Sequence, residues 1–156
     1  MSEVKRILDQ LHRSYYGPAW HGPAIVEILR GVTAGQAAAR PIAGGHSIWE
    51  LFLHVSAWED VARRRINGGR IPSLEPEQDF PAPGEPVDAN WKKARAHAEQ
   101  VHLALEECVG LLRDGRLEET VEGEEKHSIY TLLHGVIQHN LYHAGQMALL
   151  AKAAAK

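Results

Sequence analysis

The sequence is poor in cysteine and in long apolar runs, and both shortages limit what the protein can be. Its 156 residues include one cysteine, Cys108, so no disulfide can form within the chain. There is no run of about 18 consecutive apolar residues, which a membrane-spanning helix requires. The N-terminal segment is amphipathic and lacks the continuous apolar run of a secretory signal. We therefore expect a cytoplasmic protein in a reducing compartment, with no membrane partner.

The chain also lacks an excess of basic residues. It has 17 lysines and arginines against 20 acidic residues, for a formal net charge of −3. A nucleic-acid-binding protein normally presents a basic face, so we expect no nucleic-acid partner. A chain of this length can bury roughly 70% of its unfolded surface in one core. We expect a single domain over residues 1–156, and any bound metal would then serve function rather than folding.

Histidine, in contrast, is abundant. The chain has 10 histidines but only 2 phenylalanines and 2 methionines. The positions of these histidines along the predicted helices therefore carry most of the functional information.

Apolar residues at helical spacing predict an all-α fold, a four-helix bundle without convincing strands. Ser47 and Glu50 have the spacing of a capping box, which places a helix start between them. The third main helix is the cleanest, because its apolar residues alternate spacings of three and four. The expected main helices cover residues 3–15, 47–66 and 89–113, and a last one runs from Ser128 almost to the C-terminus.

The connections between these helices differ greatly in length. Residues 68–87 hold five of the eight prolines and form a long irregular connection. Such a length suggests a crossover between the second and third main helices rather than a tight hairpin. Residues 114–126 are polar and acidic, including Glu124 and Glu125, and predict a solvated loop with a short extended piece around Leu117 and Val121.

Two histidines of the last predicted helix share its inward face. At about 100° per residue, His143 falls within the apolar stripe, His139 lies at its edge, and His134 points to the opposite, solvent side. Neutral imidazoles one turn apart can both reach one metal ion at about 2.0–2.1 Å. A third ligand is needed, and His54, on the flank of the apolar stripe of the second main helix, is the best candidate.

Spacing alone leaves two interpretations of these histidines open. One is a three-ligand site with open coordination positions, which is typical of catalytic rather than structural zinc. The other is a set of hydrogen-bonded core histidines. The H-E-x-x-H motif of metalloproteases is absent, because Asn140, Leu141 and Tyr142 separate His139 from His143. The ligand helix therefore offers no adjacent general base.

Three further groups have two interpretations each. His46 and His127 precede helix starts, where they either form local hydrogen bonds or lie near a substrate. Glu59 lies close to an apolar stripe and must pair, either with Arg63 or with a metal-bound water. The run from Arg63 to Arg65 is either a solvated helix end or an anion site for the carboxylates of a thiol cofactor.

Other side chains are assigned structural roles. Cys108 lies on the packing seam of its helix and is interpreted as a small buried apolar residue. Trp49 points away from the apolar stripe of its helix and is a candidate anchor for a dimer contact. Trp20, Trp49 and Trp58 are all expected in the core or in an interface. Five histidines are expected at the surface: His12, His21, His97, His102 and His134.

Two segments carry a family resemblance. The second main helix reads HSIWELFLHVSAWE and the last helix contains HGVIQHNLYHAGQ. The most specific pieces are the single histidine in L-F-L-H and the H-x-x-x-H followed by A-G-Q. Together with the helix order and the long middle connection, they resemble the DinB-like (YfiT-like) superfamily of metal-dependent four-helix-bundle proteins. The resemblance covers most of the chain and implies that His54, His139 and His143 are metal ligands.

The resemblance also implies properties that the residues themselves do not show. It implies an up-down-down-up bundle, frequent homodimers, and nickel or zinc as the divalent ion. Some relatives transfer groups to a low-molecular-weight thiol, which would make this protein a thiol-dependent S-transferase acting on a small-molecule substrate. A metal-dependent hydrolase is an alternative, because the same ion can activate water. A non-catalytic metal-binding or stress-associated bundle protein is the third interpretation of its function.

Overall fold

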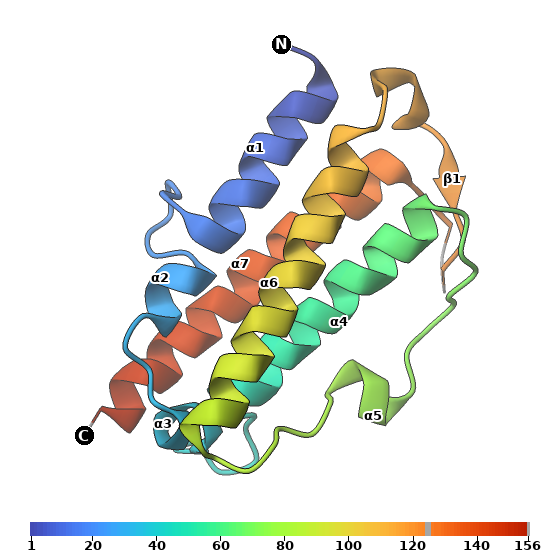
Figure 1. Ribbon diagram of the computed structural model, residues 1–156. Coiled ribbons are helices and arrows are strands. Elements are labelled where there is room, and N and C mark those ends of the chain that lie inside the picture. Colours follow the sequence, from blue (N-terminus) through green and yellow to red (C-terminus); the bar gives the residue numbers. More distant parts are fainter. Residues whose placement is uncertain (124–125, 156) are drawn as a thin grey trace.

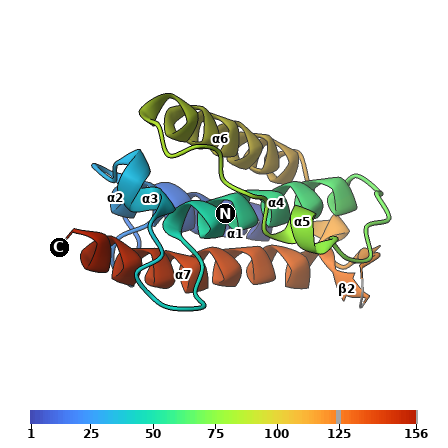
Figure 2. The ribbon, with the colours of Figure 1, turned by 90° about the horizontal axis from the view of Figure 1, so that it is seen from below.

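Four long helices form the body of the protein. A computed structural model describes residues 1–123 and 126–155, and within them the regular structure is mostly helical, as predicted. Figure 1 shows the long helices running alongside one another, and Figure 2 shows α4 between α6 and α7. The long helices are α1 (Glu3–Tyr16), α4 (Ile48–Ile66), α6 (Asp88–Gly110) and α7 (Ile129–Ala154). The short elements are α2 (Ile25–Leu29), α3 (Ala34–Ala38), α5 (Pro76–Asp79), the 3-10 turn η1 (Asp114–Arg116), β1 (Thr120–Val121) and β2 (His127–Ser128).

Serine caps mark where three of the four long helices begin, α1, α4 and α7. The Ser47 hydroxyl accepts the Glu50 amide hydrogen at 3.2 Å, and the Glu50 carboxylate accepts the Ser47 amide hydrogen at 2.8 Å. This capping box satisfies two backbone donors that the first turn of α4 leaves free. Ser128 caps α7 by accepting from the Thr131 amide. The H-S-I tripeptide before both helices therefore marks similar helix-start chemistry.

The acidic segment before α7 is more ordered than the sequence predicted. β1 and β2 pair antiparallel, with Thr120 opposite Ser128 and Val121 opposite His127. The expectation of a bundle without strands is therefore wrong for this one short pair, although an extended piece was predicted at Val121. Glu124 and Glu125, which the loop prediction included, lie outside the described residues. The pair fastens the connection to the start of α7.

The core divides into two apolar clusters, one toward α2 and α3 and one toward η1 and β1. Trp49 belongs to the first cluster, is only 1% exposed, and lies 5.0 Å from Trp91 between ring centroids. The expectation of a core position for Trp49 is confirmed, and the hypothesis that it is an exposed anchor for a dimer contact is wrong. Trp91 of α6 and residues of α2 and α3 join Trp49 in one apolar cluster on the side that was expected to face solvent. Trp20, expected in the core or an interface, is fully exposed in the single chain.

The long connection between α4 and α6 runs back beside the bundle and carries α5 (Figure 1). This single helical turn was not predicted, because four residues are too few to show periodicity. α5 packs against α4, so the connection brings side chains to the body of the bundle. Within the described residues, no helix combines the length and apolar character needed to cross a membrane.

Two leucines of α6 test the packing directly. Leu105 has no exposed surface and Leu103 is 49% exposed, although they lie two residues apart. We expect Leu105→Ala to lower the free energy of unfolding by about 3 kcal/mol, because it leaves a cavity in the core. Leu103→Ala should change it by less than about 0.5 kcal/mol. Urea denaturation of both variants measures the difference, and equal losses would contradict the described packing.

Candidate metal centre

α4 and α7 bring three histidines together in the middle of the bundle. His54 comes from α4, and His139 and His143 come from consecutive turns of α7. One ligand nitrogen from each residue lies within 4.8 Å of the other two. The three side chains that the sequence placed on inward faces therefore converge on one point.

The rings meet edge to face rather than stacking on one another. Nε2 of His54 lies 2.9 Å from Nε2 of His139. The ring centroid of His143 lies 4.7 Å from that of His54 and 4.4 Å from that of His139, with interplanar angles near 80°. Rings in this arrangement can point their lone pairs at a shared centre, as metal coordination requires.

Neighbouring acceptors orient two of the three rings. The Nδ1 atom of His54 lies 2.7 Å from the main-chain oxygen of Asp79 and 3.0 Å from its carboxylate. The Nδ1 atom of His143 lies 2.7 Å from the Gln146 side-chain oxygen. Because acceptors hold the hydrogen on Nδ1, each ring presents the Nε2 lone pair to the centre. Such partners are usual behind metal-ligating histidines.

The third ring has a buried nitrogen that remains unsatisfied. Nδ1 of His139 is buried and has no hydrogen-bond partner in residues 1–123 and 126–155. Burial lowers the pKa of His139 to about 3, and the nearby His143 and His54 add to that effect. Burial also lowers the pKa of His143. Both rings are therefore neutral at physiological pH, the form that binds metal, and the donor set fits a divalent ion.

The connection between α4 and α6 covers one side of this cluster. Phe80 stacks on His54 with 4.0 Å between ring centroids and on His46 with 3.9 Å, both nearly parallel, so Phe80 is sandwiched between them. The indole nitrogen of Trp58 donates to the Asp79 carboxylate at 2.7 Å. Asp79 and Phe80 were not found from the sequence, because nothing in the pattern of residues 68–87 indicates which of them fold back onto α4.

A cavity of about 510 Å³ opens beside the histidines. Its walls are mostly apolar, from α4 and α7, and Arg65 and Thr131 supply polar groups. A cavity of this size suits a small organic ligand. The apolar and aromatic residues that line it are Trp58, Val61, Ala62, Leu132, Val136 and Tyr142.

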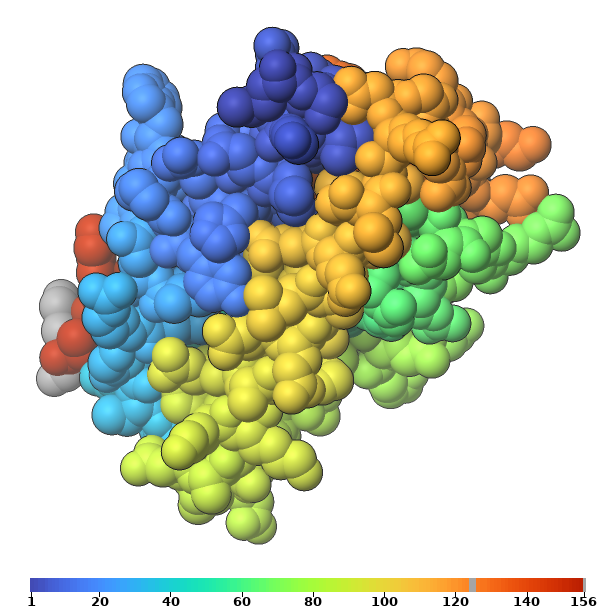
Figure 3. Space-filling model, turned by 45° about the horizontal axis from the view of Figure 1, so that its top comes forward, coloured from blue at the N-terminus to red at the C-terminus, as the bar shows by residue number. Residues whose placement is uncertain are grey.

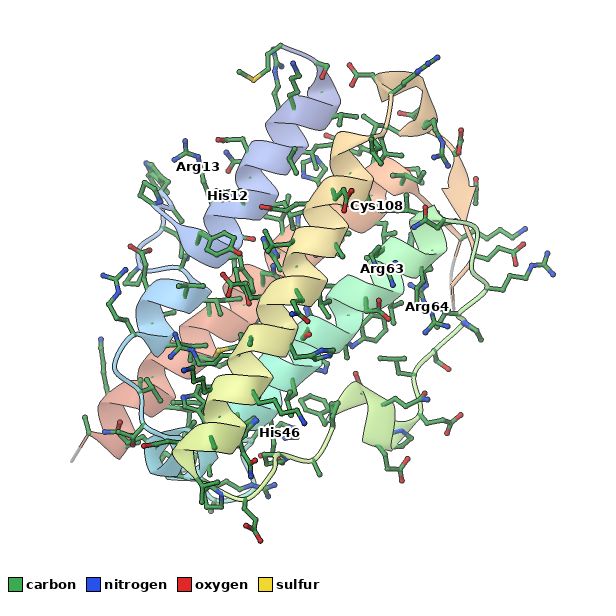
Figure 4. All side chains as sticks on the ribbon, in the orientation of Figure 1. His12, Arg13, His46, Arg63, Arg64 and Cys108 are labelled. Carbon is green, nitrogen blue, oxygen red and sulfur yellow. The ribbon has the colours of Figure 1, made fainter. Side chains whose placement is uncertain are left out.

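Arg65 departs from the expected solvated helix end. Its guanidinium is buried, donates to the main-chain oxygens of Ile71 and Pro72, and lies 5.7 Å from the Trp58 ring centroid. The expectation therefore holds only for Arg63 and Arg64, which Figure 4 shows at the β1 end of α4. His46, also labelled there, lies at the opposite end of the bundle.

A second buried cluster lies next to the histidines and contains a carboxylate. Glu59 is fully buried, and its Oε1 atom lies 2.9 Å from Nδ1 of His102 and accepts a hydrogen bond from Asn140 at 2.8 Å. Nε2 of His102 lies 3.2 Å from Glu106. The expected pairing of Glu59 with Arg63 is wrong, because Arg63 pairs with Asp60. The alternative partner, a metal-bound water, stays a prediction; the second carboxylate oxygen, Oε2, has no partner within the described residues.

His102 differs most from its predicted position among the histidines. It was expected at the surface and has no exposed side-chain area. Burial alone would lower its pKa, but hydrogen bonds to Glu106 and Glu59 outweigh that effect and raise the pKa to about 9. His102 is therefore an imidazolium at neutral pH. A signal was present in the sequence, because Ala98, His102 and Leu105 share one face of α6.

The remaining singled-out residues lie outside the histidine cluster. Cys108 is half-buried near the β1 end of α6 (Figure 4), and burial raises the pKa of its thiol. His134, predicted on the solvent side, is half-buried beside Tyr130. His127 lies in β2 and lines the cavity beside the three histidines.

A family model describing the DinB superfamily matches residues 20–147. The chain belongs to the DinB superfamily. The match covers most of the chain and includes all three clustered histidines, so it confirms the resemblance seen in the sequence. Neither a search of curated proteins nor a search of solved structures finds a match. The activity of this DinB protein must therefore be argued from its own residues.

The raised pKa of His102 predicts how stability depends on pH. A histidine whose folded-state pKa exceeds its ordinary value of 6.5 stabilises the fold fully below pH 6.5 and loses that effect as the pH rises to about 9. We expect the unfolding free energy to fall over this range by up to about 3 kcal/mol. Urea denaturation in chelator-containing buffers at several pH values measures the loss.

Two variants provide the comparison. His102→Gln should remove most of the slope between pH 6.5 and 9, and it should also lower stability at pH 6.5. His97→Gln, an exposed histidine on the same helix, should leave the slope unchanged. A parent protein equally stable at both pH values would contradict a buried imidazolium.

Proposed function

We propose that the protein binds one divalent metal ion through His54, His139 and His143 and uses it in the chemistry of a small molecule. The observation that carries the proposal is the convergence of three imidazoles, two of them with a lowered pKa, beside an open cavity. Nickel and zinc are the ions proposed, since both accept nitrogen ligands. A purely structural role for the three histidines would not require a cavity beside them.

The proposed reaction is transfer of a group to a low-molecular-weight thiol. His54, His139 and His143 would hold the ion as three neutral ligands, and a bound ion would supply the positive charge that lowers the pKa of a thiol. The protein's own residues position the reactants: Asp79 and Gln146 hold two ligand rings, and Phe80 covers one side. The apolar cavity would receive the electrophile.

Arg65 supports a thiol that carries an anionic group. It lines the cavity beside the histidines, and its charge has no carboxylate partner within the described residues. Its guanidinium is instead held by main-chain oxygens. A fixed cation at the cavity wall would attract the carboxylate of such a thiol.

Two alternatives remain within the same site. A metal-dependent hydrolase would use the same ligands with water in place of the thiol. A non-catalytic metal-binding or stress-associated protein would use the ion without turnover. The cavity favours a reaction over simple metal storage, because storage needs no space for a second molecule.

Other features of the proposal concern the whole chain. We propose one domain over residues 1–156, an up-down-down-up order of the four long helices, a homodimer and a cytoplasmic location. The long connection between α4 and α6 supports the helix order, because it is long enough to return to the end of the bundle at which α4 begins (Figure 1).

Metal content tests the ligand set. We expect protein purified without added metal to carry close to one equivalent of nickel or zinc, measured by plasma mass spectrometry. His54→Ala and His139→Ala should each lose at least about nine-tenths of it, since ligand removal weakens binding strongly. His134→Ala, on the same helix as His139 but outside the cluster, should keep the parental load.

Circular dichroism should show that all of these variants remain helical. If His54→Ala and His139→Ala carry the same metal load as the parent protein, the three-histidine site is wrong.

Turnover distinguishes the transferase from its alternatives. We expect the metal-loaded protein to conjugate an aryl halide with at least one member of a panel of small thiols. A chelator or His139→Ala should abolish product, because the thiol then keeps its proton. Ester hydrolysis under the same conditions would instead favour the hydrolase. Metal binding with no chelator-sensitive product in either assay would favour the non-catalytic protein.

A further inference from the structure

A second cavity, of about 530 Å³, lies between α1, α2 and α6. None of its lining residues lines the cavity beside the three histidines. Figure 3 shows the face of the molecule on which α2, in light blue, and the first half of α6, in yellow-green, adjoin. The volume is in the range of small-molecule sites. The second cavity therefore lies apart from the proposed metal centre and is lined by different residues.

Aromatic side chains form much of its wall. Phe52 and Trp91 are both buried, and their rings meet edge to face at 5.7 Å. The indole nitrogen of Trp91 already donates to the Val32 carbonyl at 2.9 Å, so what it offers a ligand is apolar ring surface. Walls of this kind bind flat apolar groups well, because aromatic rings attract one another at such distances.

One polar atom in this wall has no partner. Tyr15 lines the cavity and is only 2% exposed, yet its hydroxyl makes no hydrogen bond to any residue in 1–123 or 126–155. Its ring is fixed by stacking on His102 at 3.9 Å. Burial raises the pKa of Tyr15, so the hydroxyl stays protonated and is available as a donor. A hydroxyl at the cavity wall that no protein group engages can donate to an acceptor on a bound molecule.

Cationic groups stand at the mouth of this cavity. Lys92 and Arg95 are three positions apart on α6, and neither forms an ion pair within the described residues. Arg95 is half-buried and close enough to Tyr15 for its charge to lower the pKa of that hydroxyl. Two acidic residues that also line the cavity have other partners than these cations. Glu99 accepts a hydrogen bond from the Tyr16 hydroxyl at 3.4 Å. Asp88 lies in the first turn of α6, where the helix dipole stabilises its negative charge.

We propose that this cavity binds a small molecule with one carboxylate and a flat apolar body. Arg95 and the Tyr15 hydroxyl receive the carboxylate, and the rings of Phe52 and Trp91 contact the body. An arginine can hold both carboxylate oxygens at once, and the apolar wall around it excludes water from that pair. Binding here requires no metal ion and does not depend on the proposed function of the histidine cluster.

The test uses 2-naphthoate as the probe and the full chain in a chelator-containing buffer. Amide signals followed by NMR should shift saturably in α2 and in the first half of α6. The neutral analogue 2-naphthamide should bind at least about tenfold more weakly, because it lacks the charge that Arg95 recognises. Acetate, which lacks the apolar body, should give no saturable shifts over the same concentrations.

Three variants locate the contacts. Arg95→Gln should weaken 2-naphthoate binding by about tenfold or more, since it removes the charged guanidinium that holds both carboxylate oxygens. Tyr15→Phe should weaken binding by about three- to tenfold, since it removes one hydrogen-bond donor. Lys93→Gln removes the same charge from an exposed position on the same helix that does not line the cavity, and it should bind like the parent. Arg95 lies at the cavity mouth, so its variant is expected to fold.

Four results would overturn the proposal, and three of them concern affinity. These three are the absence of saturable shifts with 2-naphthoate, equal affinity for 2-naphthoate and 2-naphthamide, and parental affinity in Arg95→Gln. Shifts confined to residues around His54 and His139 would also overturn it, because they would place the probe in the other cavity.

Discussion

The carboxylate of Glu59 is the constraint on which the interior of this bundle depends. It has no exposed surface, and an unpaired charge in that position would cost several kcal/mol, so partners must reach it from other helices. His102 of α6 and Asn140 of α7 supply them, and Asn140 also donates to Ser14 of α1. This buried network thereby links side chains of all four long helices. His54 lies on the same helix as Glu59, and His139 adjoins Asn140 in sequence, so the network joins the two helices that carry the histidine cluster.

The histidine cluster needs a second element that the four long helices do not provide. The short helix α5 and the residue after it bring Asp79 and Phe80 against His54, where one orients the ring and the other covers it. A long connection of little regular structure thus completes the site. This division is common in proteins, since rigid helices place the reactive groups and a connection between them adjusts their surroundings.

The sequence predicted the helices and the shared face of His139 and His143 well because both depend on local periodicity, and the family resemblance supported His54, from another helix, as the third member of the cluster. Ser47 and Glu50 mark the start of α4, and the four-residue spacing of His139 and His143 puts both on one face of α7. It failed where the outcome depends on contacts between distant segments. Trp49 is buried because Trp91 of α6 and residues of α2 and α3 join it in one apolar cluster, and Arg65 is buried because residues 71 and 72 accept its hydrogen bonds. No pattern within α4 carries that information.

The contrast between two buried histidines shows why residue type alone did not settle function. His139 and His102 both point inward from long helices, yet the pKa of the first is lowered to about 3 and that of the second is raised to about 9. Burial disfavours the charged form of both rings, so the difference comes from the neighbours. Other imidazoles surround His139, whereas Glu59 and Glu106 flank His102. A neutral ring with a free lone pair suits a cation, and a charged ring held between carboxylates binds none. The same interior therefore contains one histidine suited to coordination and one suited to holding helices together, and the placement of the carboxylates separates the two roles.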